Sequence, residues 1–189
     1  MRQDLFRRSR PLLAAVSMAV LGWAALGRAQ TTGQNNAQLK VLPVRGHIYM
    51  LSGAGGNIAL SVGDDGILLV DSGLASMSDK VLAAINQLSQ TLASKGLSGT
   101  NIAPPKPVRF IINTHAHPDH FGGNEKLATS GKTYTGGNVF GDLNQGAQIY
   151  AHENVLNAMS VIKPPLPNGV LPTDTYHVES MNLSHFFNG

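Results

Sequence analysis

A short polar run with four metal-binding side chains is the most informative feature of this sequence. Residues 114–120 read Thr-His-Ala-His-Pro-Asp-His and supply His115, His117, Asp119 and His120. Imidazole binds zinc and iron, and a carboxylate extends the choice to manganese. The 189-residue chain has no cysteine, so thiolate sites are excluded. The run therefore predicts a metal site built from nitrogen and oxygen ligands.

The spacing within the run suits two neighbouring ligand positions. Residues two apart at a strand end point the same way, so His115 and His117 can reach one ion together. Pro118 turns the chain toward a helix, which places Asp119 and His120 beside a second position. Paired metal sites hold their ions about 3.5–4 Å apart. The alternative for Asp119 is that it only caps the helix that follows.

The elements before the run explain how it would be positioned. Strands are predicted over residues 47–52, 57–62 and 67–70, joined by turns into an antiparallel meander. Apolar residues then recur at helical spacing from Met77 to Leu92, with Ser76 and Asp79 expected to cap that helix. A loop over residues 96–107 leads to a buried strand from Arg109 to Asn113, and the histidine run begins at its end.

The pattern after the run repeats strand and helix. A strand is predicted over residues 148–151, a helix over 152–160, a proline-rich loop over 163–172 and a further strand from 176 to 178. Residues 183–189 are expected to form a strand that runs into a turn. A meander followed by alternating strands and helices predicts an α/β fold with a mixed sheet covered by helices.

The amino end has the features of an export signal. Arg2, Arg7, Arg8 and Arg10 precede an uncharged run over residues 11–27, and small residues follow before Gln30. We predict a signal peptide over residues 1–29 and a periplasmic or secreted protein. The alternative is a retained membrane anchor, although the run is shorter than the roughly 20 residues that a spanning helix needs.

The rest of the chain is predicted to be one domain. A flexible leader is expected over residues 30–38 and the domain over 39–189. The formal charge is +3 for the whole chain, but residues after 29 hold nine basic and ten acidic side chains. No basic patch argues for nucleic acid. The expected partner is a small-molecule substrate, with no stable membrane association after cleavage. The sequence indicates no oligomeric state.

Several segments together resemble the metallo-β-lactamase superfamily, whose signature is His-x-His-x-Asp-His. The matching segments are Gly55-Gly-Asn57, Leu69-Val-Asp-Ser-Gly73, the stretch from Phe110 to Asn124, and Ile149-Tyr-Ala-His-Glu153. The resemblance implies a metallo-β-lactamase-like αββα sandwich, of which this chain would supply mostly the N-terminal half. The signature is specific for the superfamily but does not identify a substrate.

The resemblance also implies residue roles. His115 and His117 would bind a first zinc ion, and Asp119 and His120 a second. Asp119 would be catalytic because it would also orient the metal-activated water that attacks the substrate. Asp71 would lie in the second shell, positioning a ligand histidine or the turn beneath it; the alternative is that it only bonds its own turn before Ser72.

The chain departs from the family pattern downstream of the run. The family carries a further histidine, a bridging aspartate and a last histidine there, in a His-Thr-x-Gly-Asp-like context that this sequence lacks. His152, His177 and His185 lack the matching neighbours and are not assigned as ligands. The chain is therefore predicted to be truncated, an incomplete domain with about half of a site.

Three functions are compatible with these features. The first is a zinc-dependent hydrolase of an ester, lactam, lactone, thioester, or phosphate or sulfate ester, with one or two ions and with iron or manganese as possible substitutes. The second is a non-haem iron dioxygenase of sulfur compounds with the same fold. The third is an inactive truncated fragment.

Overall fold

The computed structural model describes residues 38–94, 107–131, 146–183, 186 and 188. The predicted signal peptide, all but the last residue of the predicted leader, and most of the predicted loop over residues 96–107 lie outside these ranges. In the described part of the chain, no helix is both long enough and apolar enough to cross a bilayer.

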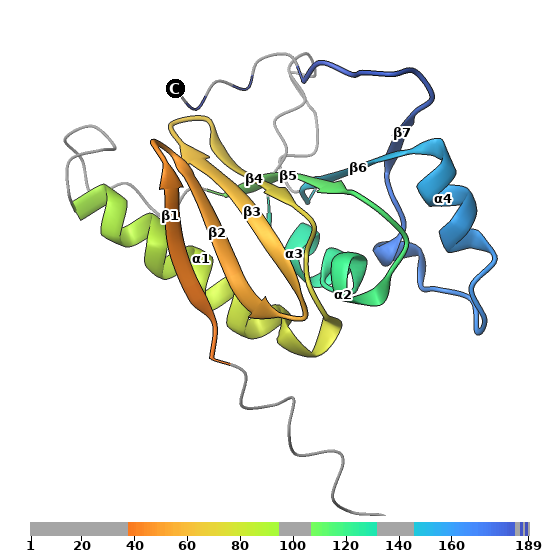
Figure 1. The fold of residues 1–189 in the computed structure, drawn as a ribbon, viewed down its shortest axis with the longest axis horizontal. Coiled ribbons are helices and arrows are strands. Elements are labelled where there is room, and N and C mark those ends of the chain that lie inside the picture. Colours follow the sequence, from red (N-terminus) through yellow and green to blue (C-terminus); the bar gives the residue numbers. More distant parts are fainter. Residues whose placement is uncertain (1–37, 95–106, 132–145, 184–185, 187, 189) are drawn as a thin grey trace, which may run out of the picture. The chain divides into compact units, whose positions relative to one another are not determined.

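Within the described residues, a seven-stranded mixed sheet organises the fold, and its strands lie side by side in sequence order (Figure 1). The antiparallel part consists of β1 (Lys40–Arg45), β2 (Ile48–Ala54), β3 (Gly56–Gly63) and β4 (Gly66–Val70). The parallel part continues from β4 through β5 (Val108–Asn113), β6 (Gln148–His152) and β7 (Asp174–Tyr176). The carboxyl ends of four parallel strands therefore share one edge of the sheet.

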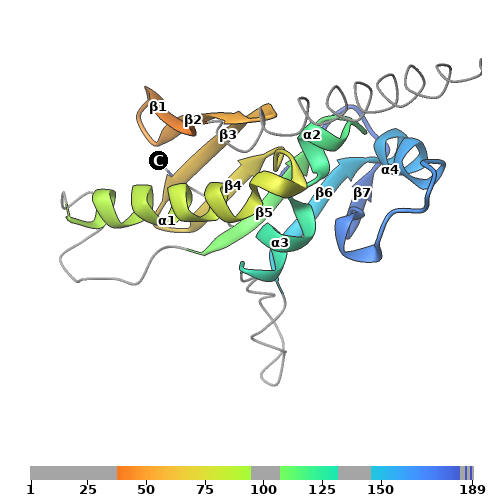
Figure 2. The ribbon, with the colours of Figure 1, turned by 90° about the horizontal axis from the view of Figure 1, so that it is seen from below.

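Helices connect and cover these strands (Figures 1 and 2). A 3-10 turn, η1 (Ala75–Met77), leads into α1 (Ser78–Ser94) between β4 and β5. Two short helices, α2 (Pro118–Phe121) and α3 (Asn124–Thr129), follow β5. The remaining helical elements are α4 (Glu153–Ser160) after β6 and the 3-10 turn η2 (Asn168–Val170) before β7.

The main core forms between one face of the sheet and helices α1 and α3. Alternate residues of β3 and β4, such as Leu60 and Leu69, are buried there against Val81 and Ile85 of α1 and Leu127 of α3. Full burial of a side chain of this size stabilises the fold by about 1.5–3 kcal/mol. A smaller apolar cluster centred on Phe121, Met159 and Val170 packs α2, α4 and η2 together. The two clusters pack the helices that follow β4 and β5 against the rest of the fold.

The predicted α/β class is confirmed, because the described residues form a mixed sheet with helices packed on it. Each of the strands predicted before residue 152 lies within two or three residues of an observed one. The last predicted strand, residues 176–178, was placed too late, because β7 ends at Tyr176. Ser76 does not cap α1, since it lies inside η1 and the helix begins at Ser78.

Two further differences concern the ends of the domain. Strand β1 was not predicted, because most of its residues are exposed and Pro43 interrupts its polar and apolar alternation. The strand expected over residues 183–189 is not observed at Leu183, Phe186 or Asn188, and the other four positions lie outside the described residues.

Candidate metal centre

The candidate site lies where the chain leaves the adjacent parallel strands β4 and β5. Val70 pairs with Ile112 in register, and the Asp71 N–H donates to the Ile112 carbonyl at 2.8 Å. Asp71 and the start of the histidine run are therefore neighbours at one edge of the sheet, although 44 residues separate Asp71 from His115 in the sequence. Parallel pairing, rather than any local motif, brings them together.

Asp71 organises this edge. It is 4% exposed and has a φ of 67°, which makes it the one non-glycine residue with positive φ in the described part of the chain. Aspartate tolerates this left-handed conformation better than most residues. Its Oδ1 accepts the Thr114 N–H at 2.8 Å, and its Oδ2 lies 2.7 Å from His120 Nδ1. The carboxylate thus binds both ends of the run.

The contact with Asp71 fixes how the His120 ring is presented. A carboxylate at Nδ1 favours the tautomer with its proton on that nitrogen, which leaves Nε2 available as a ligand. The hydroxyl of Thr114 donates to the same carboxylate at 2.8 Å from Oδ2 and also lies 2.9 Å from His115 Nδ1. Asp71, with Thr114, therefore holds both imidazoles in place.

Three residues form a group that could hold a metal ion in the described part of the chain. Asp71, His115 and His120 each offer one ligand atom, and these atoms lie within 4.8 Å of one another. The rings of His115 and His120 are 4.0 Å apart between centroids. The Asp71 carboxylate contacts His120 Nδ1, so it can orient the His120 ring. The same carboxylate also lies close enough to the other ligand atoms to be near a bound ion.

The other two predicted ligands lie beside this group. The ring of His117 packs edge-on against that of His115, with centroids 4.7 Å apart. Asp119 Oδ2 lies 3.6 Å from His120 Nε2. His117, not Asp119, is the N-cap of α2, and Pro118 is its first residue. All five predicted site residues thus lie close together, although only Asp71, His115 and His120 form the group that could hold an ion. His115 lies in a bend beyond β5 and His117 directly precedes α2, so neither lies on the strand.

Glycine allows the backbone of β3 to pass close to the run. A Cβ at Gly56 would lie 2.8 Å from the Asp119 carbonyl oxygen and 2.9 Å from His120 Nε2. At Gly122, after α2, a Cβ would lie 2.5 Å from the Pro118 carbonyl oxygen. Side chains at these two positions would push the run away from the sheet, so glycine is a packing requirement of the site.

A buried polar cluster lies beneath the run and was given no role from the sequence. Its members are Ser72, Asn113 and Asn124, which are between 0% and 3% exposed. Ser72 follows Asp71 directly, and its N–H donates to the His120 carbonyl at 2.7 Å. The one local signal in the sequence is Asn113, a polar residue that ends a mostly apolar strand immediately before the run.

The described histidines outside the run, His47, His152 and His177, are not members of this group. His152 ends β6 and caps α4, because its Nδ1 accepts the Asn154 N–H at 3.1 Å. His177 is exposed just after β7, and His185 lies outside the described residues. The group of ligand atoms around Asp71 includes neither described residue.

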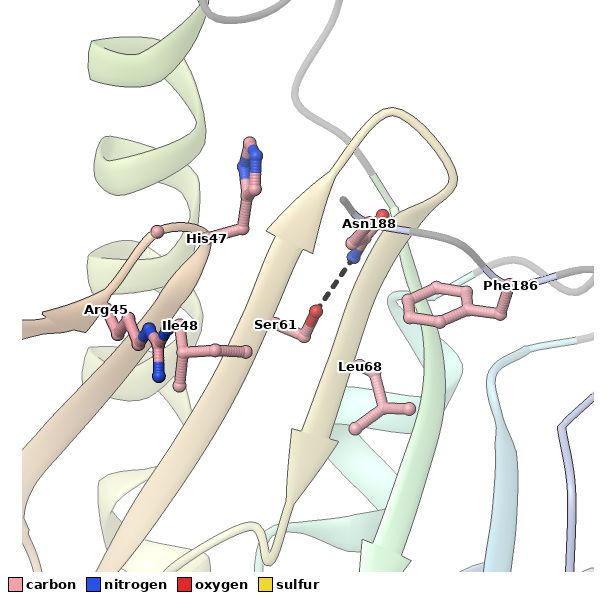
Figure 3. A pocket seen from close by; sticks show the side chains of 8 residues that line it. Arg45, His47, Ile48, Ser61, Leu68, Phe186 and Asn188 are labelled. Atoms are coloured by element: carbon pink, nitrogen blue, oxygen red, sulfur yellow. Dashed lines mark hydrogen bonds between the residues drawn. The ribbon is translucent and has the colours of Figure 1, made fainter.

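A hollow of about 600 Å³ lies elsewhere on the sheet. Ile48 and Leu68 alternate with residues that face α1, so their side chains line the opposite face (Figure 3). Phe186 forms part of the wall, and Asn188 donates to Ser61 Oγ at 3.1 Å. The hollow is near the β3–β4 turn, at the end of β4 opposite Asp71, and is separate from the metal centre.

Comparisons with known proteins indicate the family of this chain. The family model described as the metallo-beta-lactamase superfamily matches residues 52–142, a range that contains Asp71 and the whole histidine run. The chain therefore belongs to the metallo-β-lactamase superfamily. No curated protein showed significant sequence similarity to it.

Solved structures of metallo-β-lactamases show partial similarity. The first, described as a B3 metallo-beta-lactamase with an active-site glutamic acid, is 23% identical over 79% of this chain and 41% of its own, with a TM-score of 0.46. A Cronobacter sakazakii enzyme with a HARLDQ motif is 18% identical over 76% of this chain and 46% of its own, with a TM-score of 0.39. MEM-A1, a subclass B3 enzyme from a soil metagenome library, is 20% identical over 77% of this chain and 47% of its own, with a TM-score of 0.45. The chain spans less than half the length of each.

Proposed function

We propose that this chain provides the first part of the metal centre of a zinc-dependent hydrolase. The observation that carries the proposal is the contact of the Asp71 carboxylate with His120 Nδ1, with the tilted His115 ring 4.0 Å from the His120 ring between centroids. A carboxylate on the far nitrogen of a histidine is the usual support for a metal-ligating imidazole. Ligands of nitrogen and oxygen at this spacing suit zinc, and iron or manganese could substitute.

The proposed roles are those that the family resemblance implies. His115 and His117 would hold one ion, and Asp119 and His120 a second, with Asp71 orienting His120. Zinc supplies a Lewis acid and an acidified water when bound. The part of Asp119 in the reaction is to accept a hydrogen bond from the attacking water and so to orient it, because its carboxylate is half-exposed beside His120 Nε2.

The substrate class follows from the chemistry such a site supports. An ester, lactam, lactone or thioester carbonyl, or a phosphate or sulfate ester, would be polarised and attacked by water. The chain covers less than half of each solved enzyme described above. Substrate turnover is therefore proposed for the whole protein. The export signal proposed from the sequence would place that protein in the periplasm or outside the cell.

Metal binding by the full 189-residue chain provides the first test. Calorimetric titration with Zn²⁺ should show binding to the wild type that is lost in the double variant His115→Ala/His117→Ala. His47→Ala removes a histidine from the β1–β2 turn and should bind as the wild type does. Equal Zn²⁺ binding by the double variant would refute the proposed ligands.

Activity separates the proposed hydrolase from the alternatives. A panel of β-lactam, lactone, thioester and phosphate ester substrates should reveal at least one turnover that a chelator abolishes and Zn²⁺ restores. Iron as the main metal after native purification, with oxygen uptake on a thiol substrate, would favour the dioxygenase. Zn²⁺ binding without turnover of any substrate would identify an inactive fragment.

A further inference from the structure

The polar cluster beneath the metal centre is built around one fully buried side chain. Asn124, the first residue of α3, is 0% exposed. Its amide can make four hydrogen bonds, two through Oδ1 and two through Nδ2. A buried amide that leaves any of these unmade loses free energy, so the number of partners is informative.

All four positions on the Asn124 amide are used. Oδ1 accepts from the Ser72 hydroxyl at 2.8 Å and from Asn113 Nδ2 at 3.1 Å. Nδ2 donates to Asn113 Oδ1 at 2.7 Å and to the Val170 carbonyl at 2.8 Å. The Val170 carbonyl can only accept, which settles which end of the amide faces it. Only an asparagine side chain supplies this pattern at this length.

The partners of Asn124 belong to the segments that carry the proposed ligands. Ser72 follows Asp71, and its N–H holds the His120 backbone. Asn113 ends β5, two residues before His115. Asn124 therefore connects two segments. One contains Ser72, which holds the His120 backbone, and the other is the end of β5, which His115 follows. Its fourth bond, to Val170, anchors this joint to η2 and the smaller apolar cluster.

We propose that Asn124 is a positioning residue for the metal centre. It holds the ends of β4 and β5 at the separation at which His115 and His120 can both belong to the proposed metal centre. The inference rests on the proposed function, because it concerns how the same site is kept in shape. Asn124 touches neither histidine ring and acts through Ser72 and Asn113.

The test compares Asn124→Asp with a control from the same helix. The aspartate has the same shape but lacks the donor that faces the Val170 carbonyl. Leu127→Ala shortens a fully buried side chain of α3 that packs in the main core and has no part in the polar cluster. Both variants should lower the melting temperature. Co²⁺ serves as the probe, because its visible spectrum reports ligand geometry.

Binding is measured on the full chain at a temperature at which circular dichroism shows every variant folded. Asn124→Asp is expected to weaken Co²⁺ binding about tenfold, as changes behind metal ligands do, and to alter the spectrum of the bound ion. Leu127→Ala should bind within about twofold of the wild type with an unchanged spectrum. Equal effects of the two variants, or no effect of Asn124→Asp, would overturn the inference.

A milder variant keeps the test decisive if Asn124→Asp does not fold. Ser72→Ala removes the hydroxyl that donates to Asn124 Oδ1 at 2.8 Å and also lies 3.1 Å from the His120 carbonyl oxygen, while the bond from the Ser72 N–H to that carbonyl stays in place. It should weaken Co²⁺ binding severalfold and alter the spectrum; wild-type binding and spectrum in this variant would count against the role of Asn124. If the wild type itself bound no Co²⁺, the proposed metal site would fail and this inference with it. If only the comparison between variants failed, the metal site would stand.

Discussion

At the scale of single residues, Asp71 has more influence on the site than its place outside the histidine run suggests. One buried carboxylate receives the Thr114 backbone and hydroxyl and contacts His120 Nδ1. These bonds would not be expected if Asp71 served only the turn before Ser72, because they cross to a segment more than 40 residues away. The role of Asp71 as the support of a ligand histidine remains a prediction from the family resemblance.

Replacing Asp71 should therefore weaken metal binding without dismantling the fold. Asp71→Asn keeps the shape and tolerates the positive φ, but it removes the charge that polarises His120. Calorimetry should show Zn²⁺ affinity about 10- to 100-fold lower. Asp79→Asn, which removes a carboxylate from an exposed pair with Lys126, is the matched control. Equal affinities for the two variants would show that Asp71 does not support the ligands.

Gly56 offers a second test at this scale. In Gly56→Ala the new Cβ would approach His120 Nε2 to 2.9 Å, so the run must move and Zn²⁺ affinity should fall about tenfold or more. Gly46→Ala is the control, because it has a φ of 52° but nothing within 4 Å of its Cβ. The control should lose about 1–2 kcal/mol of stability, because a Cβ disfavours the left-handed conformation, and keep its Zn²⁺ affinity. Unchanged Zn²⁺ affinity in Gly56→Ala would contradict the close packing of β3 on the run.

At the scale of elements, the sequence predicted what depends on local pattern. Alternation in β3 and helical spacing in α1 reflect burial on one face, which a short window of sequence records. Strand β1 lies at an edge and is mostly exposed, so it carries no such pattern. The histidine run was recognised because its residues are adjacent, whereas the roles of Asn124 and Gly56 depend on contacts that parallel pairing and chain packing create across the fold.

The pairing of β6 with β7 has a consequence for pH dependence. Tyr150 in β6 is in register with Asp174 in β7. Burial, and to a lesser extent the negative charge of Asp174, raise the pKa of Tyr150 above its ordinary value. The folded state then holds the phenolic proton more tightly than the unfolded state. Stability contributed by this group is fully present below about pH 10 and is lost as pH rises above it.

Tyr150→Phe should remove this alkaline loss. The variant also loses the hydrogen bond from Tyr150 to Gln148 Oε1, which lowers stability by a similar amount at every pH below 10. The informative quantity is therefore the slope: between about pH 9.5 and 11, the urea midpoint of the wild type should fall more steeply than that of the variant. Asp174→Asn should reduce the slope only in part, because burial is the larger cause. Parallel slopes for all three proteins would contradict the raised pKa.

At the scale of the whole molecule, the candidate metal centre joins parts of the chain that the sheet has already brought together. Asp71 comes from the end of β4, His115 from the end of β5, and His120 from the helix that follows. An unfolded chain does not hold these groups within a few ångströms. A metal ion that binds them therefore binds the folded state preferentially and stabilises the fold as a whole.

Zinc should thus raise the melting temperature of the full chain in a concentration-dependent way. At a hundredfold excess over the dissociation constant the stabilisation is about 2.7 kcal/mol, which corresponds to about 5–10 °C for a domain of this size. A chelator should reverse the shift, and Mg²⁺ should not reproduce it, because that ion prefers oxygen ligands and retains its water. In His115→Ala/His117→Ala the shift should vanish, since the remaining residues at the centre no longer include two imidazoles that can share an ion. A shift that persisted in this variant would mean that zinc binds at another place on the molecule. That result would refute the histidine run as the metal centre.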